Sequence, residues 1–294
     1  MADIRNDLIS ATAVRNPYLV SQLVKPISVQ TITGSYFPVL YGTSTVQTNR
    51  SLAAAPTAEA LGDNAQTFSL QEQMDRIVID DRLKGQYGGL AGAQKVAAAR
   101  GQMAVFRKIE SLLAAQVLDG GLTASVSNPS TNWLNDLRVA AQALRDICNA
   151  RIGLVTSFTN WASLVNDSGI KGAMSEEPSV IVQPNAEGIR DVRRTLMASV
   201  IGVDEVFIGS NDAWYTPVTA KTSVAVVALP NGANTPEMEV QPLSFVHQVV
   251  ENETGIINVT THYSDDLKGD VVDVRGFALF DVINADLGRL VKLS

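Results

Sequence analysis

The sequence predicts a mixed α+β fold with two unlike parts, and three observations support this. Residues 68–80 alternate like one long strand, and residues 90–118 have the pattern of one long helix. Residues 132–240 alternate between helical patterns and short apolar runs, which is typical of an α/β domain. A long strand that leads into a long, isolated helix is unusual in a compact enzyme. The sequence therefore favours a subunit that reaches over its neighbours.

The long strand changes character along its length. Its more apolar face consists of Phe68, Leu70, Met74 and Val78. Glu72 and Arg76 interrupt this face, whereas Ile77 and Ile79 make the last residues apolar on both sides. This pattern predicts a change from half-solvated to buried surroundings. Because the strand is longer than the usual length of about five or six residues, we expect much of it to project from the body as half of a hairpin.

A glycine-rich hinge at residues 85–89 precedes the predicted long helix, residues 90–118. Many alanines give this segment a high helix propensity. Gly120 and Gly121 follow its last residues, as glycine commonly does at a helix C-terminus. The expected core-facing stripe consists of Val96, Met103, Phe106, Leu113 and Val117. At about 1.5 Å per residue, the helix forms a rod on the order of 40 Å long.

Residues 1–35 are predicted to form an extended N-terminal arm, because their apolar residues are scattered and Pro26 interrupts any helix. A β-prone stretch, Tyr36–Val46, follows. With the long strand it predicts an extended loop, residues 36–81, built as a long hairpin with a wide tip around residues 53–64. The tip is either a flexible surface loop of a monomer or a segment that lies across a neighbouring subunit.

The second half of the chain is more regular. Helices are expected at about residues 133–150, 160–165 and 185–200, with Asn185 as a candidate cap of the last one. Short strands are expected at residues 154–158, 179–182, 205–209 and 222–229. Three further β-prone runs occupy residues 256–263, 271–280 and 289–293. We expect these last strands to return to the long strand and helix of the first half.

Composition limits the classes of function. The chain has 294 residues, of which 46% are hydrophobic and 18% are charged, and its net charge is -7. This length suffices for one large or two ordinary domains. The acidic balance argues against a protein that coats nucleic acid through an overall basic surface. No apolar run is long enough to span a bilayer, so no membrane partner is predicted.

No motif defines a catalytic, cofactor-binding or metal-binding site, and the sequence predicts none. Cys148 is the only cysteine, and with His247 and His262 it gives no metal-ligand cluster of the usual spacing. Residues 85–89 lack both the Gly-Lys-Ser/Thr ending of a P-loop and the glycine pattern of a dinucleotide site. Adjacent acidic residues occur at Asp80–Asp81, Glu176–Glu177, Asp204–Glu205 and Asp265–Asp266. Solvated turns and helix starts are the simplest interpretation of these pairs.

Three arginines, Arg190, Arg193 and Arg194, cluster on one predicted helix. They either remain solvated or meet carboxylates of a neighbouring subunit. Surface ion pairs contribute little on their own, so the pattern alone does not decide between these interpretations.

The order of the predicted parts resembles the tailed-phage major capsid protein with the Hong Kong 97-type fold. The resemblance rests on the runs Thr67–Leu70 and Arg76–Asp81, and on a long helix that contains Arg107-Lys108-Ile109-Glu110. The resemblance implies an N-terminal arm (1–35), an extended loop (36–81), a peripheral domain (82–131 and 241–294) with a spine helix (90–118), and an axial domain (132–240).

The same resemblance implies a shell subunit rather than an enzyme. Such subunits assemble into hexamers and pentamers that form the icosahedral head of a tailed double-stranded DNA bacteriophage. The expected partners are the chain itself, portal, scaffolding and decoration proteins, and enclosed double-stranded DNA held without sequence specificity. The expected location is the virion capsid, after assembly in the host bacterial cytoplasm. An encapsulin-like nanocompartment shell protein and a cytosolic α/β enzyme are the alternatives.

Overall fold

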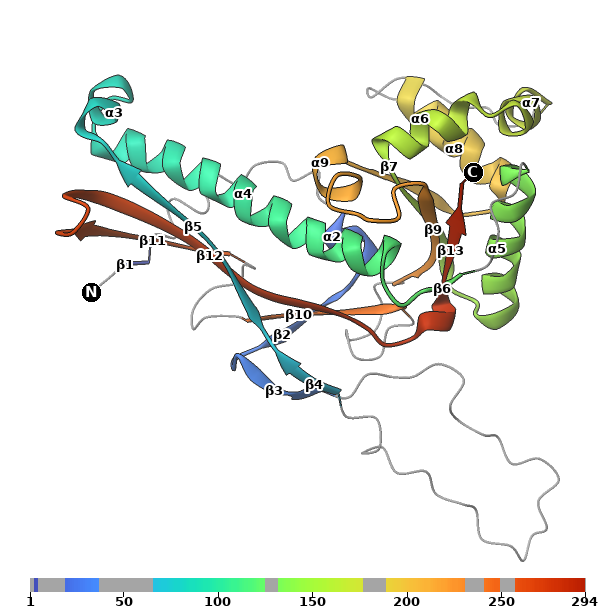
Figure 1. The fold of residues 1–294 in the computed structure, drawn as a ribbon, viewed down its shortest axis with the longest axis horizontal. Coiled ribbons are helices and arrows are strands. Elements are labelled where there is room, and N and C mark those ends of the chain that lie inside the picture. The colour runs from blue at the N-terminus through green and yellow to red at the C-terminus, as the bar shows by residue number, and fades with distance from the viewer. Residues whose placement is uncertain are drawn as a thin grey trace, which may run out of the picture.

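The computed structural model describes residues 3–4, 19–36, 66–124, 132–176, 189–230, 241–248 and 257–293. Within these residues, a six-stranded and a five-stranded sheet are joined by one long helix (Figure 1). The six-stranded sheet, the long helix and a short helix before it form an elongated end, which we call the peripheral part. The five-stranded sheet and its helices form a rounded end, which we call the axial part. The predicted α+β class is confirmed.

The sheet of the peripheral part is built around one strand. Its strands are β1 (Asp3–Ile4), β2 (Pro26–Val29), β5 (Gln71–Ile79), β10 (Leu243–Gln248), β11 (Ile257–Ser264) and β12 (Gly269–Val282). β12 pairs antiparallel with β11, β10 and β5, and β2 joins β10 in parallel. As expected, β11 and β12 return to the strand and helix of the first half.

The predicted long strand is divided into two. Its first piece, β4 (Gln66–Ser69), pairs with β3 (Thr33–Tyr36) and forms the base of a hairpin. Its second piece, β5, pairs with β12 along its whole length. The expectation that this strand projects from the body is therefore wrong for residues 71–79, because β12 supplies their backbone partners. The remainder of the expected extended loop, residues 37–65, and its tip at residues 53–64 lie outside the described residues.

The long helix α4 spans Leu90–Leu118, which is the range expected from the sequence. An additional short helix, α3 (Asp81–Gln86), precedes it. Gly88 and Gly89 turn the chain between the two helices, with φ angles of 72° and 108°. Glycine adopts this region without the strain that a Cβ would cause. The predicted glycine hinge is thus a turn between two helices rather than between a strand and a helix.

Small residues on α4 allow this helix to pack closely against β12. A Cβ at Gly101 would lie 2.5 Å from a methyl carbon of Val274, so only glycine permits this approach. Other small residues on the buried face are Ala93, Ala97, Ala98 and Ala114. Val96 and Met103, which we expected in the core-facing stripe, are each 43% exposed. The close approach of helix and sheet favours small side chains inside and leaves these larger ones outside.

The sheet of the axial part has the order β6-β13-β9-β7-β8. Its strands are β6 (Thr123–Ala124), β7 (Arg151–Ser157), β8 (Glu205–Gly209), β9 (Ser223–Leu229) and β13 (Gly288–Lys292). Its helices are α5 (Trp133–Ile147), α6 (Phe158–Asn166), α7 (Ser168–Glu176), α8 (Ile189–Ile201) and α9 (Asn211–Trp214). The expected strand at residues 179–182 and the expected cap Asn185 lie outside the described residues.

The C-terminal strand corrects one predicted boundary. We expected residues 241–294 to belong with the peripheral part, but β13 pairs antiparallel with β9 in the axial sheet. Its Val291 belongs to the axial hydrophobic core, so burial of this side chain accounts for the different location. A short 3-10 helix, η3 (Ala285–Leu287), makes the connection from β12 to β13.

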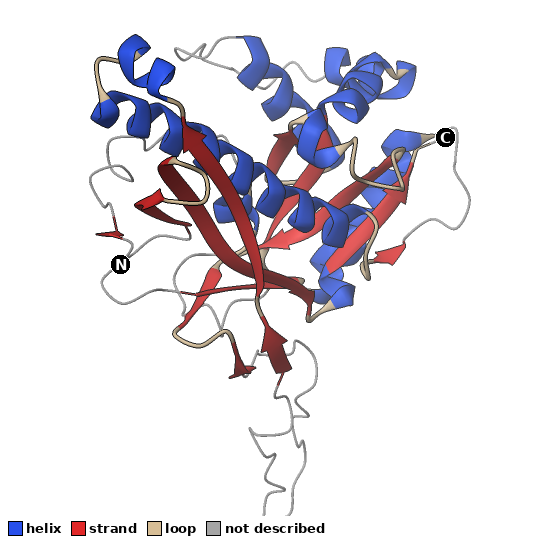
Figure 2. Cartoon of the chain, turned by 60° about the vertical axis from the view of Figure 1, so that its left-hand side comes forward, coloured by secondary structure: helices blue, strands red, loops and turns tan. Residues whose placement is uncertain are grey.

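One hydrophobic core joins both parts to the N-terminal segment. It includes Leu23 of the short helix α2 (Val20–Leu23), Leu113 of α4, Trp214 of α9 and Phe245 of β10. Figure 2 shows α4 passing from the six-stranded sheet towards the five-stranded sheet. The helix is therefore the common support on which the arm and both sheets are assembled.

Candidate assembly surfaces

The outward face of β5 alternates apolar and charged side chains. Met74 and Val78 are 39% and 40% exposed, and exposed Arg76 lies between them. The sequence pattern placed both apolar residues on one face with Phe68, but Phe68 is buried. Phe68 and Leu70 pack with Ile27 and Phe277 in a small core cluster, and Met74 and Val78 lie beyond this cluster. Two apolar side chains are consequently left on the surface of the sheet.

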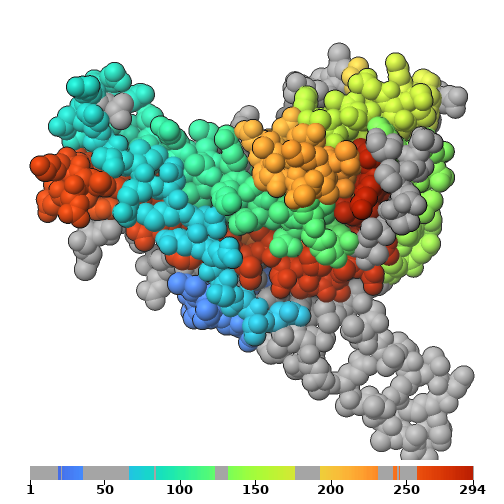
Figure 3. Space-filling view, viewed as in Figure 1, coloured from blue at the N-terminus to red at the C-terminus, as the bar shows by residue number. Residues whose placement is uncertain are grey.

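Further exposed apolar side chains lie along α4 and at the narrow end of the peripheral part. They are Tyr87, Leu90, Val96 and Met103, together with Tyr263 and Leu267 near the β11–β12 turn. Figure 3 shows α3 and this turn side by side at the narrow end. We call these six residues, with Met74 and Val78, the peripheral surface. Exposed apolar side chains that gather on one part of a protein mark interaction surfaces.

An ion-pair cluster fixes the narrow end. Lys84 Nζ lies 2.8 Å from Asp270 Oδ2 and 2.8 Å from Asp81 Oδ1. The bonds to Asp270 and Asp81 raise the pKa of Lys84, and its ammonium group lowers the pKa of Asp81. The lysine thus ties α3 to the start of β12, which holds the exposed apolar residues of both elements in one place.

A buried carboxylate ties β5 to β12. Asp273 has no exposed surface and accepts bonds from Arg76 Nε at 2.7 Å and Nη2 at 3.0 Å. Arg275 Nη2 donates a third bond at 3.3 Å, and His262 Nδ1 lies 3.8 Å away. Burial opposes ionisation of Asp273, but the two guanidinium groups outweigh it and hold its pKa below the ordinary range. The charged carboxylate therefore orients Arg76 on the outward face of β5.

Glu110 connects three segments that are far apart in the sequence. Its Oε1 accepts a bond from Trp214 Nε1 at 2.6 Å and one from the backbone N–H of Leu19 at 3.3 Å. Burial raises the pKa of Glu110, while these two hydrogen bonds act in the opposite direction. The N-terminal segment, α4 and α9 therefore meet at one buried carboxyl group.

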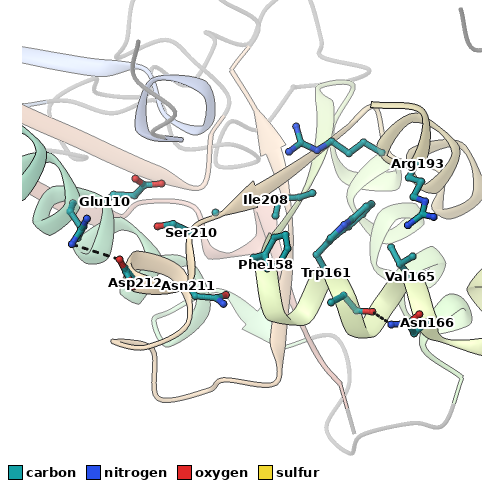
Figure 4. A pocket seen from close by; sticks show the side chains of 14 residues that line it. Glu110, Phe158, Trp161, Val165, Asn166, Arg193, Ile208, Ser210, Asn211 and Asp212 are labelled. Atoms are coloured by element: carbon teal, nitrogen blue, oxygen red, sulfur yellow. Dashed lines mark hydrogen bonds and ion pairs between the residues drawn. The ribbon is translucent and has the colours of Figure 1, made fainter. Parts of the chain in front are cut away.

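A pocket of about 750 Å³ lies between α4, α6, α8 and α9, as Figure 4 shows. Its apolar lining consists of Phe158, Trp161, Ala162, Val165 and Ile208. Arg107, Arg193 and Arg194 line it as well, and Arg107 Nη1 lies 3.6 Å from Asp212 Oδ2. The Nε atom of Arg194 is buried and has no hydrogen-bond partner among the described residues. The pocket therefore combines aromatic surface with guanidinium groups.

The residues considered in the sequence for catalysis are not brought together. Cys148 is buried at the C-terminal end of α5, whereas His262 lies beside Asp273 in the peripheral part. Among the described residues, no three His, Cys, Asp or Glu side chains come close enough to hold a metal ion. No helix in the described ranges is long and apolar enough to cross a bilayer.

The adjacent acidic residues support local structure. Asp80 Oδ1 accepts a bond from the backbone N–H of Arg82 at 2.8 Å. Asp204 Oδ2 accepts one from the backbone N–H of Ile152 at 2.7 Å, and Glu205 pairs with Arg151. Asp265 and Asp266 lie in the β11–β12 turn, and Glu177 lies outside the described residues. The interpretation as turns and helix starts holds for Asp265–Asp266 and for Asp80–Asp81, which precedes and begins α3, whereas Asp204–Glu205 leads into strand β8.

Sequence reasoning missed the two buried carboxyl groups. A signal for Asp273 existed, because it is a lone acidic residue within a run of valines, and buried acidic residues are almost always paired. The sequence around Glu110 did not indicate a buried carboxyl group, because glutamates are common on helix surfaces. Only the fold brings Trp214 and Leu19 next to Glu110. The pocket likewise depends on α4, which lies far from α6 and α8 in the sequence.

Solved structures define the class of fold. The chain has the Hong Kong 97-type fold of phage capsid proteins, as the resemblance predicted. A phage-related protein from Bordetella bronchiseptica RB50 matches with a TM-score of 0.65 and 14% identity, over 99% of this chain and 97% of that one. The capsid of cyanophage P-SCSP1u matches with a TM-score of 0.56 and 12% identity, over 96% and 90% of the two chains.

A third structure with this fold is not from a phage. The SrpI encapsulin of Synechococcus elongatus PCC 7942 matches with a TM-score of 0.52 and 10% identity, over 92% of this chain and 85% of that one. No protein-family model matches the sequence, and no curated protein matches it. At these identities the likeness establishes the fold.

Proposed function

We propose that this chain is the major capsid protein of a tailed double-stranded DNA bacteriophage. In this role it assembles into hexamers and pentamers that form the icosahedral head. The observation that carries the proposal is a fold similar to that of a cyanophage capsid over 96% of the chain. The proposed role is structural rather than enzymatic, so it depends on contact surfaces between subunits and not on an active site.

The peripheral surface supplies the driving force in this proposal. The peripheral part has one sheet and one long helix, and among the described residues no second layer covers its exposed apolar side chains. Burying apolar area stabilises a contact by about 25 cal/mol per Å². Each copy in a closed shell touches several neighbours, so contacts that are weak singly act together. The ion pairs of Lys84 and Asp273 hold the surface in a fixed shape before assembly.

The proposed partners are those expected of a capsid protein in a phage head. They are other copies of this chain, portal and scaffolding proteins, and decoration proteins where the phage has them. The enclosed double-stranded DNA is held without sequence specificity, and no membrane takes part. The chain is then located in the virion capsid after assembly in the host bacterial cytoplasm.

The direct test is the size of the purified protein. Light scattering and negative-stain images are expected to show closed particles over some range of salt and protein concentration. A monomer or dimer under every assembly condition would contradict the proposal. The particles should contain double-stranded DNA when they are isolated from infected or induced cells.

A deletion tests the proposed part of the extended loop. Removing residues 53–64 is expected to leave the circular dichroism spectrum and urea midpoint unchanged, and to lower particle yield about tenfold or more. A control that replaces these residues with a Gly/Ser segment of equal length separates loop sequence from loop length. Particles of normal yield from the deletion would refute the role of the loop.

An encapsulin-like nanocompartment is the second candidate function, and the similarity to the SrpI encapsulin favours it. Both candidates predict a closed shell, but they differ in its content. Particles from native cells that contain a protein cargo and no double-stranded DNA would favour the nanocompartment. A cytosolic α/β enzyme would instead give no shell at all.

A further inference from the structure

Strand β5 forms an open edge of the six-stranded sheet. It pairs with β12 from Gln71 to Ile79, and among the described residues no strand lies on its other side. Within the same residues, no turn or loop forms a backbone hydrogen bond with that side. Figure 3 shows β5, in cyan, uncovered between α4 and the β11–β12 end of the molecule. A row of unpaired backbone N–H and C=O groups is a ready place for another strand to pair.

The long helix leaves this edge accessible. A Cβ at Gly101 of α4 would lie 2.5 Å from a methyl carbon of Val274 in β12, but 3.7 Å from the carboxylate of Asp75 in β5. The helix therefore lies over one face of the sheet, nearer to β12 than to the open edge. Alternate residues of β5 point to the other face and remain exposed. A strand from another molecule can thus be added beside β5 without displacing α4.

The exposed residues of β5 are complementary to themselves. In chain order they are Glu72, Met74, Arg76 and Val78. In an antiparallel pair of two copies of β5, directly opposite residues share a face of the sheet, so exposed residues meet exposed residues. When Met74 lies opposite Met74 of the second copy, Glu72 of each copy lies opposite Arg76 of the other. Both charge pairs are then attractive, and the apolar side chains meet between them.

Other registers of the same pair are less favourable. The nearest ones place Met74 opposite Arg76 or opposite Glu72, which sets an apolar side chain against a charged one. The next ones place Arg76 opposite Arg76 or Glu72 opposite Glu72, and like charges directly opposite each other are destabilising. The side chains therefore favour the register centred on Met74, in which residues Gln71–Ile77 of the two copies pair.

Both charged residues can reach a second copy. Arg76 uses its Nε and Nη2 to bond Asp273 at 2.7 and 3.0 Å, yet its side chain is 50% exposed. Glu72 Oε1 lies 4.0 Å from Arg275 Nη1, and the Glu72 side chain is 43% exposed. Asp273 thus holds the guanidinium group of Arg76 on the surface, where a carboxylate of another molecule can meet it.

We propose that β5 pairs antiparallel with β5 of a second copy of this chain, around a twofold axis at Met74. The contact is isologous, and it joins the six-stranded sheets of the two copies into one continuous sheet. The place of this contact in a shell rests on the proposed function. Rings of subunits need a second kind of contact before they can close into a shell, and a twofold pairing between peripheral parts of different rings supplies it.

Cysteine cross-linking tests the pairing and its register. The full chain with Met74→Cys is treated with a mild oxidant, before and after assembly. A disulfide-linked dimer is expected, because directly opposite residues of antiparallel strands have Cα atoms about 4.5–5.5 Å apart, within the reach of a disulfide. Cys148 is buried and stays silent.

The matched control is Val78→Cys, at a similarly exposed position on the same face of β5. In the proposed register Val78 lies opposite Leu70, so the two copies of Val78 are about 26 Å apart. Its disulfide yield should be at least ten times lower than that of Met74→Cys. A yield from Val78→Cys that equals that from Met74→Cys would overturn the proposal.

A charge change tests the complementarity. Glu72→Lys, added to Met74→Cys, is expected to lower the disulfide yield about tenfold, because two lysines then face two arginines. Glu72→Asp in the same background keeps the negative charge and should stay within about threefold of the Met74→Cys chain. Asp266→Lys, at an exposed position of the β11–β12 turn, controls for net charge and should leave the yield unchanged. Circular dichroism checks that each variant folds. An unchanged yield with Glu72→Lys would contradict the proposed register.

The outcomes separate this inference from the proposed function. Shells in which Met74→Cys gives no disulfide-linked dimer would overturn the pairing and leave the shell function intact. If the wild-type protein forms no shell, the proposed function fails. A Met74 disulfide in free dimers would still support the pairing of β5 in that case.

Discussion

The axial and peripheral parts complete their burial in different ways. In the axial sheet, β9 is buried at every residue from Ser223 to Leu229, and β7 is buried from Ile152 to Ser157. In the peripheral sheet, β5 alternates between exposed and partly buried residues, although it pairs with β12 along its whole length. Among the described residues β5 has a partner strand on one side only, whereas β7 and β9 lie between two strands, so position in the sheet accompanies the difference in burial. One part finishes its core within a single chain, and the other leaves apolar surface that neighbours can cover.

The largest effect is expected from a change in the axial core. Leu154→Ala removes a side chain with no exposed surface from the middle of β7 and leaves a cavity. The expected loss is about 2–5 kcal/mol of unfolding free energy. Urea unfolding of the dissociated subunit measures it. Val139→Ala, on an exposed position of α5 in the same part, should cost much less. Equal losses for both variants would show that the axial core is not packed as described.

A smaller loss is expected for the link between β5 and β12. Asp273→Asn weakens the bonds to Arg76 and Arg275, with an expected cost of about 1–3 kcal/mol. Because the pKa of Asp273 is lowered in the folded state, its contribution is present above the ordinary carboxyl pKa. That contribution disappears as the pH falls through the lowered pKa. The urea midpoints of wild type and variant should therefore converge in acid.

The control for this change is Asp266→Asn, an exposed residue of the β11–β12 turn. It should leave the urea midpoint within experimental scatter at every pH. A midpoint difference for Asp273→Asn that persists unchanged in strong acid would contradict the assignment of Asp273 as an ionised partner.

The pH dependence of Glu110 should have the opposite sign. Burial raises its pKa, so the folded state loses stability as the pH rises from the ordinary carboxyl pKa of about 4 towards the raised value. Glu110→Gln keeps an oxygen acceptor for Trp214 and removes the charge. We expect a gain of up to about 1 kcal/mol at neutral pH and little difference in acid. Urea midpoints measured across this pH range check it. A variant that is less stable by the same amount at every pH would refute the interpretation.

Changes at the peripheral surface are expected to alter the unfolding free energy of the subunit least. The same changes should lower particle yield strongly. Met74→Ser with Val78→Ser should change the unfolding free energy by no more than about 0.5 kcal/mol, because both side chains are already exposed. Particle yield measured by light scattering should fall severalfold. Val139→Ser, at an exposed axial position, serves as the matched control and should leave the yield nearly unchanged. Equal yields for both variants would remove the proposed difference between the two parts.

Local pattern predicted the elements better than it predicted their faces. The range of α4 and that of β8 could be read from the sequence, because helix propensity and apolar runs act over neighbouring residues. The buried face of α4 could not be predicted from the sequence, because Gly101 and the alanines are needed there only since β12 packs so closely against the helix. Large apolar side chains such as Met103 were expected to be buried, but α4 lies too close to β12 to leave room for them.

Long-range pairing was the second limit of prediction. Nothing in the run Gly288–Lys292 indicates which of two sheets it will join, because both would bury its alternate residues equally well. The same holds for β5, whose partner β12 lies about two hundred residues away. The candidate site showed this limit most clearly. Arg193 and Arg194 were noticed as a cluster, but the aromatic wall beside them exists only after α6 and α8 come together.

The insertion of β13 between β6 and β9 has a consequence for synthesis in the cell. Residues 288–292 leave the ribosome after nearly all others described here, yet they occupy an interior position of the axial sheet. The axial sheet therefore cannot be completed before residues 288–292 have been synthesised. Loss of residues 288–292 would leave β6 and β9 without the strand that lies between them.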